Sequence, residues 1–140
     1  FNAAFKIGDV VQVRSDMFSE LGAEDNGRFV PAHEMKLVSA EDMVFRTNSE
    51  LDGLPKVDGI TVNKVHGSVS TIEAVKRQFN PDIETMEGAA VAYVCQQFGV
   101  PWVQIRAISN QVEPRNRDAW NIPLAIENLH AQVDRCLNSI

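Results

Sequence analysis

The chain has 140 residues, of which 44% are hydrophobic and 23% charged, and its formal net charge is -6. This length suits one domain with a single core, and the composition is that of a folded chain and not a disordered one. The acidic balance without a dense Lys/Arg stripe argues against a nucleic-acid partner, and no apolar run approaches the roughly 20 residues of a membrane span. We therefore expect a single domain, residues 1–140, with no nucleic-acid or membrane partner. Because residues 1–6 lack the pattern of a signal peptide, we expect a cytoplasmic location.

The first part of the chain is only weakly patterned. A Gly-Asp turn leads into a strand of β-branched residues over 10–13. Residues 14–31 are charged and Gly-rich, which predicts a surface loop. A short strand near 43–47 and a turn over 52–55 follow. The sequence assigns no role to residues 14–57.

The second part alternates strands with helices. Branched residues predict a strand over 60–65, and a capping-box spacing at Ser70 predicts a helix that ends at Asn80. A short extended piece over 82–85 precedes a buried helix over 88–98. This alternation with short connections predicts an α/β sheet covered by helices on both faces.

Two further elements complete the predicted sheet. Residues 101–108 are apolar on both faces, as in a central strand. The last helix begins at Asn121, which can cap it. Its predicted apolar face consists of residues at helical spacing, namely Ile122, Ile126, Leu129, Val133 and Leu137.

The stretch 85–95 places Glu87 at the head of an almost wholly apolar helix whose small residues would allow close packing on a sheet. A carboxylate in such surroundings costs free energy unless something donates hydrogen bonds to it. One candidate donor is the backbone at the start of its own helix, and the other is a ligand. From these residues alone both interpretations stay open.

Polar residues follow three predicted strands or extended segments, at positions 66–68, 86–87 and 109–110. In open α/β sheets, ligands bind beyond the carboxyl ends of strands. Together these loops supply a carboxylate, an imidazole, hydroxyls and a carboxamide, which suit a polyhydroxylated neutral ligand better than a phosphate. No Gly-rich phosphate loop is present. His33, His66 and His130 share no ligand spacing, so each is interpreted as a surface or packing residue, and we expect no metal and no cofactor.

A family resemblance rests on two motifs. Residues 86–90 (Met-Glu-Gly-Ala-Ala) and 100–109 (Val-Pro-Trp-Val-Gln-Ile-Arg-Ala-Ile-Ser) resemble the nucleoside phosphorylase and nucleosidase superfamily. Residues 106–126 are most similar to the futalosine hydrolases and less closely similar to the methylthioadenosine/S-adenosylhomocysteine nucleosidases. The resemblance covers essentially the whole chain and implies a three-layer αβα sandwich that forms a homodimer.

The activity implied by the resemblance is hydrolysis of the N-glycosidic bond of futalosine. The products would be hypoxanthine and dehypoxanthine futalosine, in menaquinone biosynthesis. The alternatives are a methylthioadenosine/S-adenosylhomocysteine nucleosidase, a purine nucleoside phosphorylase and a non-catalytic nucleoside-binding module. In every case the expected partner is a small-molecule nucleoside.

The resemblance also implies roles for the residues of the first motif. Met86 would pack on the ribose, and Glu87 would accept hydrogen bonds from its 2′- and 3′-hydroxyl groups. The two oxygens of a carboxylate can accept from a vicinal diol in charge-assisted bonds, which no neutral side chain reproduces.

The second motif would hold the base. Asn110 stands where the adenine-specific nucleosidases carry an aspartate that protonates the leaving base. An asparagine cannot act as that acid, but its amide offers a donor and an acceptor that match a 6-oxopurine such as hypoxanthine. Asn110 is thus the predicted catalytic residue, acting by hydrogen bonding to the developing charge. The other interpretation is an asparagine that merely tolerates a tight turn.

Neighbouring residues take supporting roles by the same resemblance. Arg106 would orient the residue at the leaving base, although a buried salt bridge is an alternative for it, and Ser109 would contact the base. His66 would cover the purine, with the Gly67 backbone at the base edge. The resemblance implies that the N-terminal part of the sheet, with the acid that activates water, is absent from this chain. We therefore expect the chain alone to be inactive.

Overall fold

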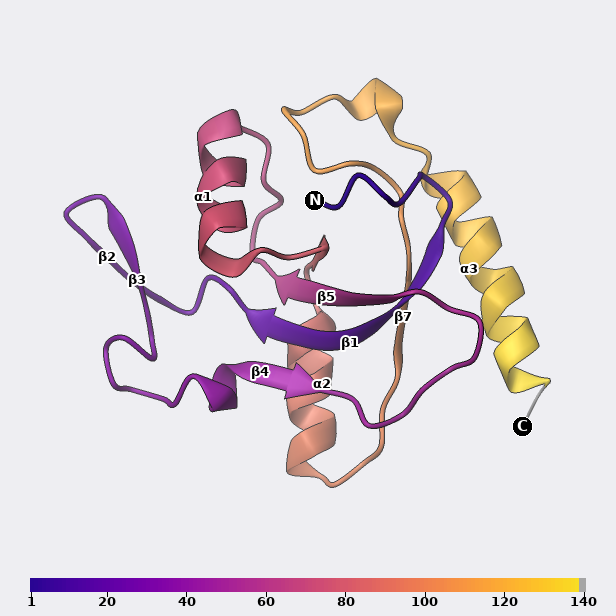
Figure 1. The fold of residues 1–140 in the computed structure, drawn as a ribbon, viewed down its shortest axis with the longest axis horizontal. Coiled ribbons are helices and arrows are strands. Elements are labelled where there is room, and N and C mark those ends of the chain that lie inside the picture. The colour runs from indigo at the N-terminus through magenta and orange to yellow at the C-terminus, as the bar shows by residue number, and fades with distance from the viewer. Residues whose placement is uncertain (139–140) are drawn as a thin grey trace.

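The computed structural model describes residues 1–138, so the last two residues of the predicted domain lie outside the described part. Its centre is β1 (Val10–Phe18). Parallel to β1 runs β5 (Lys56–Thr61), which in turn pairs in parallel with β6 (Ile83–Thr85). Two strands pair antiparallel with β1: β7 (Gln104–Ala107) with its first half and β4 (Val44–Arg46) with its second half (Figure 1). These strands form one mixed five-stranded sheet.

Within residues 1–138 three α-helices flank the sheet. In Figure 1, α2 (Gly88–Gln97) lies behind the central strands, and α3 (Ile122–Leu137) runs alongside β7. α1 (Val69–Phe79) lies near the hairpin formed by β2 (Gly22–Asp25) and β3 (Arg28–Pro31). Short 3-10 turns cover Glu41–Met43 and Arg117–Ala119. The predicted α/β class is confirmed. No helix within residues 1–138 combines the length and apolarity needed to cross a bilayer.

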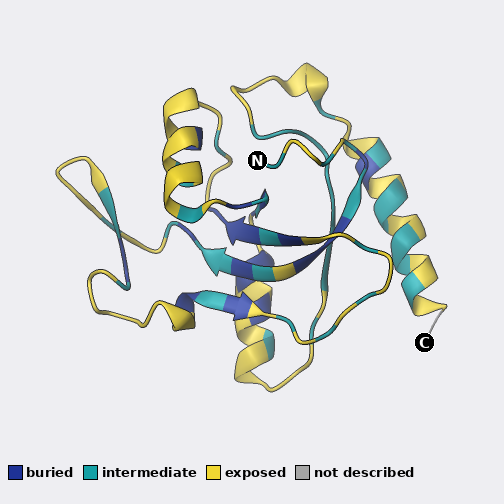
Figure 2. Cartoon of the chain, in the orientation of Figure 1, coloured by how far each residue is buried: buried dark blue, intermediate teal, exposed yellow. Residues whose placement is uncertain are grey.

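Within residues 1–138 two apolar clusters of buried residues form the core, and the dark blue segments of Figure 2 mark the buried parts of the chain. The first gathers aliphatic residues of three strands, namely Val11, Val13, Val57 and Ile83. The second joins Phe45 of β4 to Ala89 and Ala92 of α2, with Phe18 and Trp102 packed against it. The small residues of α2 therefore pack directly on the sheet, as their pattern predicted.

The predicted loop over 14–31 is wrong in part. β1 continues to Phe18, and the remainder contains the β2–β3 hairpin. Polar residues occur within β1 because neighbouring strands supply their partners: Asp58 of β5 accepts from Arg14 Nη2 at 2.6 Å and from Ser15 Oγ at 2.5 Å. The strand predicted near 43–47 is confirmed as β4.

One strand and one helix begin at other residues than the sequence predicted. The strand predicted over 60–65 begins at Lys56 and ends at Thr61, because its pairing with β1 starts opposite Gln12. The cap of α1 is Ser68, whose side chain accepts from the Thr71 N–H, instead of Ser70. The predicted end of α1 is confirmed: Asn80 adopts the left-handed conformation with φ 46°.

Burial differs from the sequence prediction in α2 and β7. The helix α2 is not fully buried, since only Gly88, Ala89 and Ala92 are covered and Phe98, just beyond its end, is 80% exposed. Within the described chain β7 pairs with β1 alone and is half-buried, so it is not the central strand that was predicted.

The predicted apolar face of α3 is also wrong in part. Ile122, Ile126 and Leu137 are exposed. The helix instead turns Ala125 and Asn128 inward, because Asn128 Nδ2 donates to the Gly8 carbonyl at 2.7 Å. The predicted cap is confirmed, since Asn121 Oδ1 accepts from the Leu124 N–H at 3.1 Å.

Candidate functional site: a polar cavity between two strand ends

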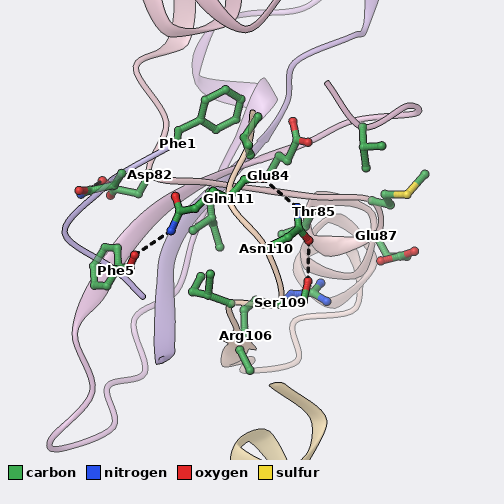
Figure 3. Close-up of a pocket in the computed structure, with 17 residues that line it drawn as sticks. Phe1, Phe5, Asp82, Glu84, Thr85, Glu87, Arg106, Ser109, Asn110 and Gln111 are labelled. Atoms are coloured by element: carbon green, nitrogen blue, oxygen red, sulfur yellow. Dashed lines mark hydrogen bonds between the residues drawn. The ribbon is translucent and has the colours of Figure 1, made fainter. Parts of the chain in front are cut away.

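A cavity of about 270 Å³ lies where β6 and β7 end, covered by the N-terminal segment. This volume is near the lower end of the range of about 300–1,000 Å³ that is typical of small-molecule sites. Figure 3 shows its mixed lining of carboxylates, amides, hydroxyls and rings. The residues labelled there are Phe1, Phe5, Asp82, Glu84, Thr85, Glu87, Arg106, Ser109, Asn110 and Gln111.

Five of the predicted site residues line this one cavity, namely Met86, Glu87, Arg106, Ser109 and Asn110. The two motifs are joined here although β7 runs antiparallel to β1, whereas β6 belongs to the parallel part of the sheet. The expected convergence of the second and third loops is thus observed, but not through a purely parallel sheet.

Glu87 is not the buried acid that the sequence predicted. It is exposed at the N-cap position of α2, and within residues 1–138 its side chain makes no capping hydrogen bond to that helix. Two threonines cap the helix instead: the Gly88 N–H donates to Thr85 Oγ1 at 3.2 Å, and the Ala89 N–H donates to Thr61 Oγ1 at 2.7 Å. The interpretation of Glu87 as a cap for its own helix is therefore wrong, and its carboxylate is available at the cavity.

The side chain of Asn110 forms hydrogen bonds with the residues directly before and after it in the chain. Its Oδ1 accepts from Ser109 Oγ at 2.7 Å, and its Nδ2 donates to the Gln111 carbonyl at 3.1 Å. Gln111 Nε2 in turn donates to the Phe5 carbonyl at 2.8 Å, which ties this turn to the N-terminal segment (Figure 3). A carboxamide has two N–H groups and two acceptor lone pairs, so each end of Asn110 has capacity for one further bond.

His66 and Gly67 do not line this cavity. They line a neighbouring hollow of about 20 Å³ that also touches Asn110. His66 Nδ1 lies 2.7 Å from Glu84 Oε2, its backbone N–H donates to Glu84 Oε1 at 3.1 Å, and both side chains are less than 10% exposed. With Nδ1–H facing the carboxylate, a neutral ring presents Nε2 as an acceptor. The role of His66 at the base stays a prediction.

Two carboxylates at the cavity, Glu84 and Asp82, were missed from the sequence. The period-two alternation of β6 could have indicated that Glu84 faces away from the buried Ile83 and Thr85. Asp82 accepts from Asn2 Nδ2 and from the Asp58 N–H, each at 2.8 Å, and no local signal marks those partners. Arg106 Nε donates to Gln104 Oε1 at 2.8 Å, so its observed partner is an amide and not a carboxylate.

No metal site emerges in the described chain. Within residues 1–138 no three or more His, Cys, Asp or Glu side chains gather in a way that could hold an ion. The three histidines considered as ligands in the sequence do not form such a group either.

A mixed α/β sheet with a polar cavity at strand ends is typical of proteins that bind small ligands. Residues 1–138 match the Phosphorylase superfamily, and the chain belongs to this family. The predicted superfamily is therefore confirmed.

Two individual relatives have names that are more specific than the name of the superfamily. The chain is 31% identical over 133 residues to a futalosine hydrolase of Acidothermus cellulolyticus, covering 88% of this chain and 54% of that protein. It is 42% identical over 66 residues to a 5′-methylthioadenosine/S-adenosylhomocysteine nucleosidase of Geobacillus kaustophilus, covering 44% of this chain and 28% of that protein. The chain thus spans about half the length of the futalosine hydrolase that it matches.

A solved structure supports the fold. A mutant 5′-methylthioadenosine/S-adenosylhomocysteine nucleosidase of Helicobacter pylori, solved with 5′-methylthioadenosine in its active site, superposes on this chain with a TM-score of 0.79. The match covers 99% of this chain and 64% of that one at 18% identity, so it supports the fold alone.

Proposed function

We propose that this protein is a nucleosidase that hydrolyses the N-glycosidic bond of futalosine, a step of menaquinone biosynthesis. One observation carries the proposal: a carboxylate that its own helix does not use and a carboxamide, Glu87 and Asn110, line the same cavity. The futalosine hydrolase relatives support the choice of substrate.

In the proposed complex the ribose lies against Met86 and Glu87. The carboxylate accepts from both ribose hydroxyl groups, and the exposed thioether packs on the sugar. We expect Glu87→Gln to weaken nucleoside binding by roughly 10- to 100-fold, the equivalent of about 1.5–3 kcal/mol for hydrogen bonds to a charged group. The matched control is Glu73→Gln on α1, since that glutamate is exposed and is not among the residues that line the cavity. Equal affinities of the two variants would remove Glu87 from the site.

The purine lies against Ser109 and Asn110. As the glycosidic bond breaks, the departing base keeps the bonding electron pair and its N7 takes a proton from water. The Asn110 amide donates to O6 and accepts from N7–H of hypoxanthine, which stabilises the charge on the departing base. We expect Asn110→Asp to shift the preference from hypoxanthine nucleosides towards adenine nucleosides. Competition between inosine and adenosine measures this shift, and an unchanged preference would contradict the assignment of the base.

A second candidate is a methylthioadenosine/S-adenosylhomocysteine nucleosidase. The specific observation in its favour is the 42% identity to a relative of that name, although over only 66 residues. Adenine release from methylthioadenosine, without hypoxanthine release from futalosine, would favour it. Release that depends on phosphate would favour a phosphorylase, and a ligand recovered intact would favour a binding module.

Hydrolysis also needs a base that activates water. Two carboxylates at the cavity are already engaged, Asp82 with Asn2 and the Asp58 backbone, and Glu84 with His66. We therefore propose that residues 1–140 bind the nucleoside without turnover. Hypoxanthine release from futalosine is measured for residues 1–140 and for the protein as its gene encodes it. Turnover by residues 1–140 would contradict the proposed inactivity, and none by the whole protein would contradict the proposed function.

We further propose that the protein acts in the cytoplasm as a homodimer. Exposed apolar side chains on and beside α2 support an interface with a second copy, since Val91 is 57% exposed and Phe98 is 80% exposed. Sedimentation equilibrium of the wild type and of Phe98→Asp tests this. We expect the dimer to weaken in the variant, and a monomeric wild type would contradict the proposal.

A further inference from the structure

The carboxylate of Asp16 lies beneath both walls of the cavity and is not itself part of its lining. It stands in the second half of β1 and is 0% exposed. Burial raises the pKa of this carboxyl above its ordinary value, while hydrogen bonds from Gln104, Thr61 and the Met17 backbone and the charge of Arg106 offset part of that rise. A buried carboxylate is costly unless several donors face it, so its neighbours are the key to its role.

Two threonines connect the Asp16 carboxylate to the start of α2 by hydrogen bonds. Thr61 Oγ1 donates to Asp16 Oδ1 at 2.9 Å while it accepts from the Ala89 N–H. Thr85 Oγ1 donates to Asp16 Oδ2 at 3.4 Å while it accepts from the Gly88 N–H. The first amides of α2 thus reach one carboxylate, each through a hydroxyl group. Because Glu87 precedes these amides directly, whatever fixes them also fixes its backbone.

Gln104 connects the Asp16 carboxylate to the opposite wall of the cavity, where Arg106 lies. Gln104 Nε2 donates to Asp16 Oδ2 at 3.0 Å, and Gln104 Oε1 accepts from Arg106 Nε at 2.8 Å. A carboxylate only accepts, so Asp16 determines which end of the Gln104 amide faces Arg106. Were the amide reversed, an N–H group would face the guanidinium and the contact would be lost. The direction of Arg106 at the cavity therefore depends on Asp16.

We propose that Asp16 is a positioning residue that fixes both walls of the cavity: the start of α2 through Thr61 and Thr85, and Arg106 through Gln104. The inference rests on the proposed function for its effect on nucleoside binding. Its effect on the hydrogen bonds of the free protein can be measured without any ligand.

The test is an exchange of charge between two residues. In Asp16→Asn one of the two acceptor oxygens becomes an N–H donor. If this donor faces the Gln104 amide N–H, Gln104 must reverse and abandon Arg106, and if it faces Thr61, the Thr61 hydroxyl loses the acceptor of its proton. In Gln104→Glu two carboxylates face each other. The double variant Asp16→Asn/Gln104→Glu restores the order of donors and acceptors, because the amide introduced at position 16 would donate to the carboxylate introduced at position 104, which would also accept from Arg106. If Asp16 were important only for folding, the double variant would not restore what each single variant loses.

The first measurement is the affinity for inosine divided by that for 2′-deoxyinosine, in the protein as its gene encodes it. This ratio reports the placement of Glu87 and not the amount of folded protein. We expect it to fall by about tenfold or more in Asp16→Asn, as a small misplacement of binding groups commonly brings, and to recover in the double variant. Asp58→Asn is the control, since Asp58 is a carboxylate of the same sheet bonded to Arg14 and Ser15. A ratio unchanged in folded Asp16→Asn would overturn the proposal.

The second measurement is hydrogen exchange at the Gly88 and Ala89 amides and at Arg106 Nε without ligand. We expect exchange at the Gly88 and Ala89 amides or at Arg106 Nε to quicken by about tenfold or more in Asp16→Asn, because the bonds of at least one wall then open more often, and to slow again in the double variant. Unchanged exchange would overturn the proposal. Should Asp16→Asn fail to fold, the double variant decides: a folded double variant with exchange at the three sites like that of the wild type supports the proposal, and a double variant that also fails to fold refutes it. A wild-type protein that does not bind inosine would refute the proposed function. The hydrogen-exchange rates of the free protein would still test the positioning role of Asp16.

Discussion

The substitution Gly88→Ala tests how closely α2 is seated on the sheet. A methyl group at this position would overlap Asp16 Oδ2 and would lie 2.5 Å from Gln104 Oε1 and 2.8 Å from Thr85 Oγ1. None of these atoms belongs to a flexible surface side chain, since Asp16 is fully buried and Thr85 is 8% exposed. The added methyl must therefore displace the helix or break the contact between Asp16 and Gln104.

The expected loss of stability follows from three contributions. Overpacking a well-filled interior costs about 1–3 kcal/mol, and losing a hydrogen bond to a charged group costs about 1.5–3 kcal/mol. Alanine recovers up to about 1 kcal/mol over glycine through helix propensity. The free energy of unfolding should therefore fall by roughly 1.5–6 kcal/mol.

Urea unfolding at neutral pH measures this change, with Gly67→Ala as the control. A methyl group on Gly67 would meet Arg115 Cβ at 3.6 Å, an ordinary contact, so that variant should stay within about 0.5 kcal/mol of the wild type. If Gly88→Ala also stayed within that range, α2 would not be seated against Asp16 and the argument built on that contact would fail.

Three further predictions concern stability. Asn121→Ala removes the cap of α3 and should lower the free energy of unfolding by about 1 kcal/mol in a urea titration; no change would contradict the capping bond to Leu124. Ile72→Ala should cost about 2–5 kcal/mol because Ile72 is 6% exposed. Ile126→Ala should cost less than about 0.5 kcal/mol because Ile126 is 49% exposed, and similar losses for both would contradict the observed packing. For Asp16 the folded-state pKa is raised, so the stability from its titration is present below about pH 3.9 and is lost as pH rises through the raised value. The unfolding free energy of the wild type minus that of Asp16→Asn should therefore fall with pH across this window and be level above it, whereas a rise would contradict the direction of the shift.

Local chemistry made several elements predictable. The end of α1 at Asn80 and the cap of α3 at Asn121 depend on a few consecutive residues, and the structure confirms both. The small residues of α2 were correctly expected to pack on the sheet for the same reason. The two motifs at 86–87 and 109–110 were also recognisable, because each follows a predicted strand or extended segment directly.

Features that depend on distant partners were not predictable. Asp16 and Gln104 are 88 residues apart, so nothing near Asp16 indicated that its carboxylate would be buried and satisfied. The same holds for Arg14, which looked like a loop residue because its partner Asp58 lies 44 residues away. The capping of α2 by Thr61 likewise depends on pairing between strands, which is why Glu87 was wrongly considered as a cap for its own helix.

The most direct test of the central claim is a structure of the protein with inosine bound. We predict that inosine occupies the cavity between β6 and β7, with its 2′- and 3′-hydroxyl groups within hydrogen-bonding distance of Glu87. The O6 and N7 edge of its base should face Asn110. Inosine bound elsewhere, or bound in this cavity with its ribose turned away from Glu87, would contradict the proposed nucleoside site.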